Sequence, residues 1–289
     1  MPNAIVRPPT REQTLLQGLR TLNLSCMARI HPQVALAAAQ QGLSHEAFLA
    51  ELVRAECEQR TQHRLERRLQ QSKLPREKTF ATLHLDRYSP ALQLAIERLR
   101  DGAFVPQAVN VIAVGRPGSG KSHLAAALGA QLIALDYAVL WTTTATLVQR
   151  LLAAKRDLRL PQELAKLDHY AALILDDIGY VQHNREEMEV LFTLLADRYE
   201  KRSVIITTNL VFSDWGQIFK DPMTTMAAVD RVVHHSVVLD FLQVASYRAQ
   251  AAQEAARPPS GDATHPLPKH HVTLQQQEGS HAPATPTPR

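Results

Sequence analysis

The chain has 289 residues, of which 45% are hydrophobic, so it can bury more than one small core and we expect two folded units. Its longest apolar runs are too short to cross a membrane, and its first residues lack an apolar signal core, so we expect a cytoplasmic protein. Two cysteines support neither a disulfide framework nor, without histidines, a four-ligand zinc site. The formal net charge of +4 permits nucleic-acid binding without requiring it.

The N-terminal part of the chain is predicted to be helical, because its apolar residues recur at helical spacing and no strand pattern appears. Leu15 and Leu22 lie at the two ends of the first such stretch, and Gly42 separates two later ones. Ser44 is a good helix N-cap residue and precedes a long apolar stripe. We therefore expect a long helix that begins after Ser44 and stops before Pro75.

Two clusters of basic residues are candidates for contact with DNA phosphates. Between Arg54 and Lys78 the chain has eight Lys or Arg residues and four Glu, a net charge of +4 that equals the surplus of the whole chain. Lys155, Arg156 and Arg159 form the second cluster. Neither cluster contains interleaved aromatic residues, which favours contact with a duplex backbone over single-strand stacking. A solvated charged face explains either cluster equally well when it is taken alone.

Beyond a helix predicted between Ser89 and Gly102, short aliphatic runs alternate with helical stretches. This alternation is typical of a parallel β-sheet that helices cover on both faces. The predicted fold class is therefore α/β, with a five-stranded parallel sheet preceded by a small all-helical domain. The predicted strands are residues 109–114, 138–143, 171–176, 203–208 and 236–241, and helices follow the first three of them.

This pattern divides the chain into three segments. Residues 1–85 are expected to form a helical domain that binds DNA or a partner, and residues 86–256 to form the α/β core. Residues 257–289 contain seven of the 17 prolines and no aromatic residue. Because such a composition cannot bury a core, we expect this tail to be disordered.

A phosphate-binding loop is predicted directly after the first strand and before a helix that begins near Lys121. The glycines allow backbone amides to surround the β-phosphate of a nucleotide, and the helix N-terminus adds its positive dipole. Lys121 is expected to reach the β- and γ-phosphates of ATP, and Ser122 to bind Mg2+. A glycine-rich turn without a ligand is the alternative. The loop consists of Gly115, Arg116, Pro117, Gly118, Ser119, Gly120, Lys121 and Ser122.

The third predicted strand ends in two carboxylates, Asp176 and Asp177. A P-loop enzyme needs acidic groups at this position to hold the Mg2+ shell and to orient the attacking water. We assign Asp176 to Mg2+ and Asp177 to water. Many ATPases with this arrangement have the longer Glu at the second position, so Asp177 must act from further away, and an aspartate pair that caps a turn is the alternative.

Two further residues are candidates for ATP hydrolysis. Asn209 follows the fourth predicted strand at the phosphate edge of the sheet, where its amide can sense the γ-phosphate or position water. Arg231 lies on a helix predicted between the fourth and fifth strands, from which it can reach the nucleotide of a neighbouring subunit. An arginine supplied in this way implies a homo-oligomer. A strand-ending asparagine and a surface Asp-Arg pair are the simpler alternatives.

With these motifs in place, the chain resembles the IstB family of transposition helpers, relatives of the helicase loader DnaC within the initiator-like branch of AAA+ ATPases. Several of the matching stretches have no role in generic nucleotide binding, which makes the resemblance specific. The matching stretches are residues 43–49, 153–156, 175–180, 196–200, 205–210 and 246–248.

The resemblance implies ATP-dependent assembly on double-stranded DNA, presentation of target DNA, and stimulation of an IstA-like partner transposase. It also implies an AAA+ core without the C-terminal helical lid. The sequence agrees, because only residues 242–256 lie between the last predicted strand and the tail, whereas a lid needs on the order of 50 residues. Arg248 is a candidate to replace a lid arginine at the phosphate.

Three other functions are compatible with parts of the pattern. A replicative helicase loader has the same core motifs, and its N-terminal domain would grip a helicase. A small-molecule kinase would share the P-loop, but the sequence offers no acceptor pocket or closing lid. A nucleotide-binding scaffold without turnover is the third, because Asp177 is short. The transposition role itself rests on the resemblance.

Overall fold

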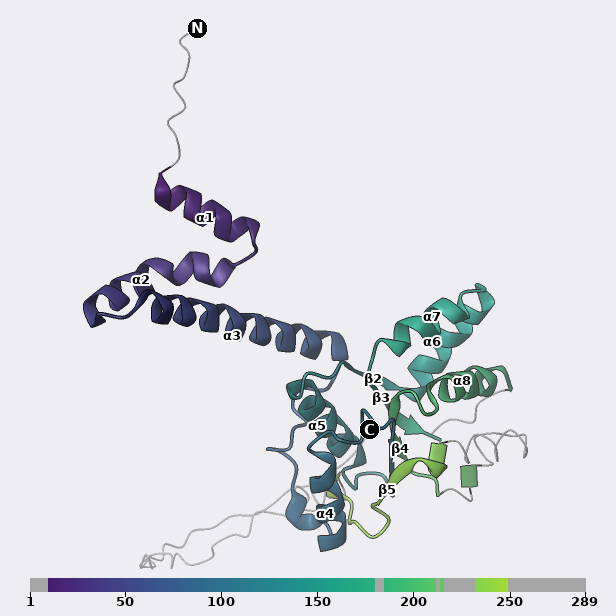
Figure 1. The fold of residues 1–289 in the computed structure, drawn as a ribbon. Helices are drawn as coiled ribbons and strands as arrows, with labels where there is room; N and C mark the ends of the chain where they lie inside the picture. Colours follow the sequence, from purple (N-terminus) through teal and green to yellow (C-terminus); the bar gives the residue numbers. More distant parts are fainter. Residues whose placement is uncertain (1–9, 180–184, 212–213, 216–231, 249–289) are drawn as a thin grey trace, which may run out of the picture.

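The computed structural model describes residues 10–179, 185–211, 214–215 and 232–248 of the chain. A long helix, α3, joins a group of N-terminal helices to an α/β core (Figure 1). The helices are α1 (Arg11–Thr21), α2 (Ser25–Gln41), α3 (His45–Ser72), α4 (Pro90–Leu99), α5 (Lys121–Ala134), α6 (Thr144–Arg156), α7 (Leu160–Asp168) and α8 (Arg185–Arg198), with a short 3-10 helix at Leu85–Arg87. The strands are β1 (Asn110–Val114), β2 (Val139–Thr143), β3 (Ala172–Ile178), β4 (Ser203–Thr208) and β5 (Ser236–Asp240).

The ends of α2 and α3 form where the sequence predicted them. Gly42 follows α2 in the left-handed conformation, with φ of 64°, which glycine adopts without a Cβ penalty. The Ser44 hydroxyl accepts a hydrogen bond from the backbone N–H of Ala47, so Ser44 is the N-cap of α3. α3 ends at Ser72, ahead of Pro75, after 28 residues.

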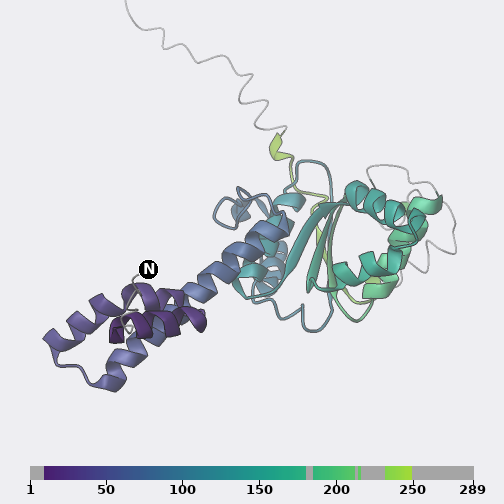
Figure 2. The ribbon, with the colours of Figure 1, turned by 90° about the horizontal axis from the view of Figure 1, so that it is seen from above.

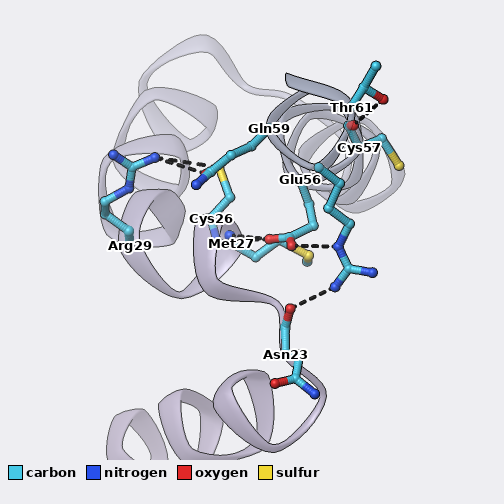
Figure 3. A network of polar contacts seen from close by, with 9 residues as sticks. Asn23, Cys26, Met27, Arg29, Glu56, Cys57, Gln59 and Thr61 are labelled. Carbon is cyan, nitrogen blue, oxygen red and sulfur yellow. Dashed lines mark hydrogen bonds and ion pairs between the residues drawn. The ribbon is translucent and has the colours of Figure 1, made fainter. Parts of the chain in front are cut away.

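One buried carboxylate ties α3 to the start of α2 (Figure 3). Glu56 is only 4% exposed, and its carboxylate accepts hydrogen bonds from the backbone N–H groups of Cys26 and Met27, at 2.9 and 3.0 Å. Arg60 donates to the same carboxylate at 2.9 Å and to the carbonyl oxygen of Asn23 at 2.6 Å. Glu56 thus satisfies free N–H groups in the first turn of α2, and its negative charge interacts favourably with the positive end of the helix dipole.

The five strands form one fully parallel sheet in the order β2-β3-β4-β1-β5. Helices α4 and α5 cover one face, and α6, α7 and α8 cover the other (Figure 2). Each face buries its own apolar cluster against the sheet. The predicted α/β sheet is confirmed, with all five strands within a residue or two of the predicted ends.

The structure adds two details. β3 continues two residues past its predicted end, to Ile178, and so includes both aspartates. The helical stretch expected after the second strand is divided into α6 and α7, because Leu158 adopts a left-handed conformation, with φ of 56°, and Pro161 lies in the first turn of a new helix that begins at Leu160.

The C-terminal end of α3 packs against the core on α5 and β2. Arg64 and Arg68 both form ion pairs with Asp136, which follows α5, at 3.1 and 2.6 Å. Just beyond the helix, Leu74 is buried next to Gly129, where an added Cβ would lie 2.9 Å from the leucine side chain. The residues after α3 therefore contribute to the apolar cluster of the core.

Two sequence predictions lie outside the described residues: the helix carrying Arg231 and the tail of residues 257–289. The described residues after β5 end at Arg248, so most of the region where a lid would lie is also outside them. Within the described ranges, no helix is long and apolar enough to cross a membrane.

Replacing Glu56 by Gln should loosen the junction of α2 and α3. Burial alone would raise the pKa of Glu56, but the hydrogen bonds from Met27, Arg60 and Cys26 outweigh it, so the pKa is lowered in the fold. Because the folded pKa is lowered, this stabilisation is present above the unfolded value of about 4.3 and is lost as the pH falls through the folded value.

We expect E56Q to lower the free energy of local opening at the junction of α2 and α3 by about 1–3 kcal/mol at neutral pH. Hydrogen exchange of the Cys26 and Met27 amides measures this free energy. E58Q is the matched control, since Glu58 is an exposed residue of the same helix that pairs only with Arg54 among the residues described. Equal protection in E56Q and E58Q would contradict the assignment.

Candidate nucleotide-binding site

The loop between β1 and α5 has the conformation that the phosphate-binding pattern predicts. Gly118 and Gly120 have φ of 80° and 101°, and α5 begins at Lys121 directly after them. The free N–H groups of the first helical turn therefore lie beside the loop. Lys121 is 6% exposed, and its ammonium donates to the carbonyl oxygen of Arg116 at 2.9 Å.

A β-bulge positions the two aspartates of β3. Leu175 pairs with Ile206 and Ile178 pairs with Thr208, so Asp176 and Asp177 together lie opposite the single residue Thr207. The buried Thr207 hydroxyl donates to the Asp176 carboxylate at 2.6 Å and accepts from the backbone N–H of Asp177 at 2.9 Å. Asp177 has φ of 61°, a conformation that aspartate tolerates better than most residues. The bulge sends Asp176 inward and Asp177 toward the loop.

A cavity of about 400 Å³ brings most of the predicted site residues together. Its walls include the loop from Pro117 to Ser122, together with Asp177 and Asn209. Gly115 and Arg116 lie just outside the lining, and Asp176 is buried beside it, 9% exposed. Arg231 lies outside the described residues.

Charges in the cavity act on one another. Burial lowers the pKa of Lys121 and Arg248 lowers it further, while Asp177 and Asp176 oppose this. The concave surroundings deprive the Asp177 carboxylate of hydration although its side chain still has exposed area, and this raises the pKa of Asp177. The Asp176 charge adds to the increase, and Lys121, Arg248 and Lys78 oppose it. The site combines cations for an anionic ligand with a carboxylate that is more basic than usual.

The chain after β5 folds back over the loop, and residues 241–248 are here named the C-terminal strap. Its Tyr247 backbone N–H donates to the carbonyl oxygen of Gly118 at 2.9 Å, and Arg87 donates to the carbonyl oxygen of Ala245 at 3.2 Å. A Cβ on Gly118 would lie 2.2 Å from the Ser246 hydroxyl. The strap therefore needs a glycine beneath it, and it carries Arg248 to the cavity.

Aromatic residues form part of the cavity wall. The Tyr247 ring is stacked on His84, with centroids 6.1 Å apart, and Arg87 lies 5.2 Å from the Tyr247 centroid. Tyr88 lies against Gly120, and burial raises the pKa of Tyr88 to about 12, against a small opposite effect of Arg87, so its hydroxyl stays protonated. Flat rings and cations beside a phosphate-binding loop suit a nucleotide.

Sequence reasoning missed the roles of Thr207 and of the aromatic part of the cavity wall. A signal existed for Thr207, since it is a polar residue within an otherwise aliphatic strand, and such residues need a buried partner. No local pattern joins His84 to Tyr247 or Tyr88 to Phe241, because the partners are far apart in the sequence and meet only through tertiary packing.

The model of the family of IstB-like ATP-binding proteins matches residues 17–255. The chain belongs to this family. A relative from Sinorhizobium fredii, named as an insertion-sequence ATP-binding protein, is 40% identical over 240 residues, covering 83% of this chain and 80% of its own. The ATP-binding protein of insertion sequence IS21 from Pseudomonas aeruginosa is 39% identical and covers 75% of this chain and 82% of its own.

Among solved structures, a DNA replication initiation factor aligns with a TM-score of 0.51 and 12% identity, covering 63% of this chain and 55% of that one. This likeness concerns the fold alone. The predicted resemblance to the IstB family is confirmed by the family match. As a member of this AAA+ family, the IstB-like chain binds ATP and is an ATPase associated with transposition.

Replacing Gly118 by Ala should displace the C-terminal strap, because the new methyl group collides with Ser246 and the residue keeps an unfavourable φ. The strain of about 1–2 kcal/mol corresponds to roughly a tenfold loss of ATP affinity in an equilibrium titration. G18A is the control, since a Cβ on Gly18 meets no atom within 4 Å. ATP affinity in G118A equal to that of the parent protein would show that the strap does not constrain the loop.

Proposed function

We propose that this IstB-like ATPase is a DNA-bound helper of transposition. It assembles as a homo-oligomer on target duplex DNA with ATP and Mg2+, presents this DNA to an IstA-like transposase or stimulates it, and is reset by hydrolysis. The observation that carries the proposal is a complete P-loop and carboxylate pair at one cavity, in a chain 40% identical to a protein named for its insertion sequence.

In this proposal the loop residues Gly115 to Ser122 bind the phosphates of ATP. Backbone amides around Gly118 and Gly120 hold the β-phosphate, and Lys121 contacts the β- and γ-phosphates once it releases the carbonyl oxygen of Arg116. Mg2+ would be held by the Ser122 hydroxyl and the Asp176 carboxylate. The donors fit, since Mg2+ prefers oxygen ligands and the carboxylate of Asp176 is fixed by Thr207.

Hydrolysis requires a water positioned at the γ-phosphate. Asp177 is proposed to orient this water, because it faces Lys121 across the cavity and its raised pKa makes it a better proton acceptor. Asn209 lines the same cavity and would sense the γ-phosphate. Arg231 is proposed to act on the nucleotide of a neighbouring subunit, which makes hydrolysis depend on assembly.

Ion pairs balance part of the positive charge in both basic clusters, and in the second one Lys155 pairs with Glu189 and Arg159 with Asp157. On α3, Arg54 and Arg60 pair with glutamates, so much of the positive charge of the helix is balanced within the chain. Arg67 makes no ion pair with any described residue, and neither does Arg156 at the end of α6. Phosphate contact by such unpaired cations gives sequence-independent, salt-sensitive binding.

The first test is binding of the purified full chain to random-sequence duplex DNA with ATP, ADP or no nucleotide. We expect tight binding only with ATP, weakening steeply as salt rises, and loss of this binding in K121A because the ammonium no longer holds the phosphates. Absence of duplex binding in all nucleotide states at low salt and high protein concentration would overturn the proposal. A helicase-loading adaptor would then be the better explanation.

The second test concerns Asp177. Its substitution in D177N should lower the rate of ATP hydrolysis about 100-fold or more, because the amide cannot accept a proton. As the pH is lowered, Asp177 becomes protonated and hydrolysis by the parent protein should slow. Because the pKa of Asp177 is raised, this loss should begin at a higher pH than an ordinary aspartate would give. R248Q removes a cation that lowers the pKa of Asp177, so the hydrolysis rate of this variant should fall at a still higher pH.

D157N is the control for this series, because Asp157 is exposed at the end of α6 and does not line the cavity. If D177N hydrolyses ATP at the rate of the parent protein, Asp177 is not part of the mechanism.

A further inference from the structure

The segment between α3 and α4, residues 73–89, supplies six of the residues that line the nucleotide cavity. At its far end, His84, Arg87 and Tyr88 form the aromatic part of the wall. At its near end, Lys78 lines the same cavity as Lys121 and Asp177. The N-terminal helices are therefore joined to the core by a segment that itself forms part of the ATPase site.

The middle of this segment is fastened to the helix that begins with the phosphate-binding loop. His123 directly follows Ser122, and its imidazole Nε2 lies 3.1 Å from both the Thr82 hydroxyl and the carbonyl oxygen of Thr79. Thr82 in turn closes the turn, since its hydroxyl donates to the carbonyl oxygen of Glu77 at 2.8 Å. These bonds fix Lys78, which lies within this turn, relative to the loop.

Lys78 itself is held so that its ammonium remains available. The side chain is partly buried, and its Nζ lies 5.8 Å from the centroid of the Trp141 ring on β2. Such cation–π contact orients a lysine without neutralising it. Lys78 has no ion pair with the carboxylates in the described parts of the chain, although its charge reaches Asp177. A partly buried, oriented and unneutralised cation in a cavity is suited to an anion.

We propose that Lys78 contacts the terminal phosphate of ATP, as a second lysine beside Lys121. Lys78 lines the cavity together with Lys121 and Asp177, and its charge acts on the Asp177 carboxylate, so it lies on the side where the terminal phosphate would bind. Lys78 thereby links the N-terminal helices to the γ-phosphate, since α3 ends at Ser72, six residues before it.

Removal of the Lys78 charge tests this directly. K78M keeps the aliphatic stem against Trp141 and removes the ammonium, so affinity for a non-hydrolysable ATP analogue with Mg2+ should fall tenfold or more, the size expected for a charge-assisted contact. Affinity for ADP should change less than about threefold. K78R should retain most of the ATP affinity. R76M is the matched control, since Arg76 is exposed two residues earlier and makes no contact with the cavity.

The parent protein gives a second measurement that does not depend on a variant folding. Mg2+ with the ATP analogue should protect the Lys78 amine from acetylation several-fold more than Mg2+ with ADP, while Lys73 reacts equally in both. An unchanged ATP affinity in K78M, or an equal loss of ATP and ADP affinity, would overturn the proposal. Equal acetylation of Lys78 with both nucleotides would do so too. None of these outcomes depends on DNA binding.

Discussion

The buried hydroxyl of Thr207 is the contact on which the candidate site depends. It donates to the carboxylate of Asp176 and accepts from the backbone of Asp177, and so holds two residues of β3 opposite one of β4. A regular strand would send successive side chains to opposite faces of the sheet. The bulge instead keeps one carboxylate buried near the first turn of α5 and turns the next one into the cavity.

The strand order makes this local arrangement useful. β4 lies between β3 and β1, so the aspartates, Asn209 and the phosphate-binding loop follow three adjacent strands and meet at one edge of the sheet. Parallel strands always place their carboxyl ends together, and ligands of open α/β sheets bind there. The backbone also links these parts, since the N–H of Gly115 donates to the carbonyl oxygen of Thr208 at 3.1 Å.

Two segments from outside the sheet complete the cavity. The segment after α3 and the C-terminal strap meet where His84 and Arg87 contact Tyr247. Both lie against the loop glycines, Tyr88 against Gly120 and Ser246 against Gly118. The end of α3 contacts α5 and β2, and Arg64 and Arg68 pair with Asp136, so α3 is joined to the core by side-chain contacts as well as by the chain.

The sequence by itself determined the local elements of this protein. Helix caps such as Ser44, the aliphatic strands, the phosphate-binding loop and the family resemblance all depend on residues within a few positions of one another, where periodicity and side-chain chemistry act directly. Tertiary structure decided the strand order, the bulge at Thr207, the meeting of His84 with Tyr247, and the entry of Lys78 into the cavity. It also decided how much of the positive charge on α3 is balanced by ion pairs within the chain. These features depend on which distant segments pack together, and that is set by burial of the two apolar faces of the sheet, which no short stretch of sequence specifies.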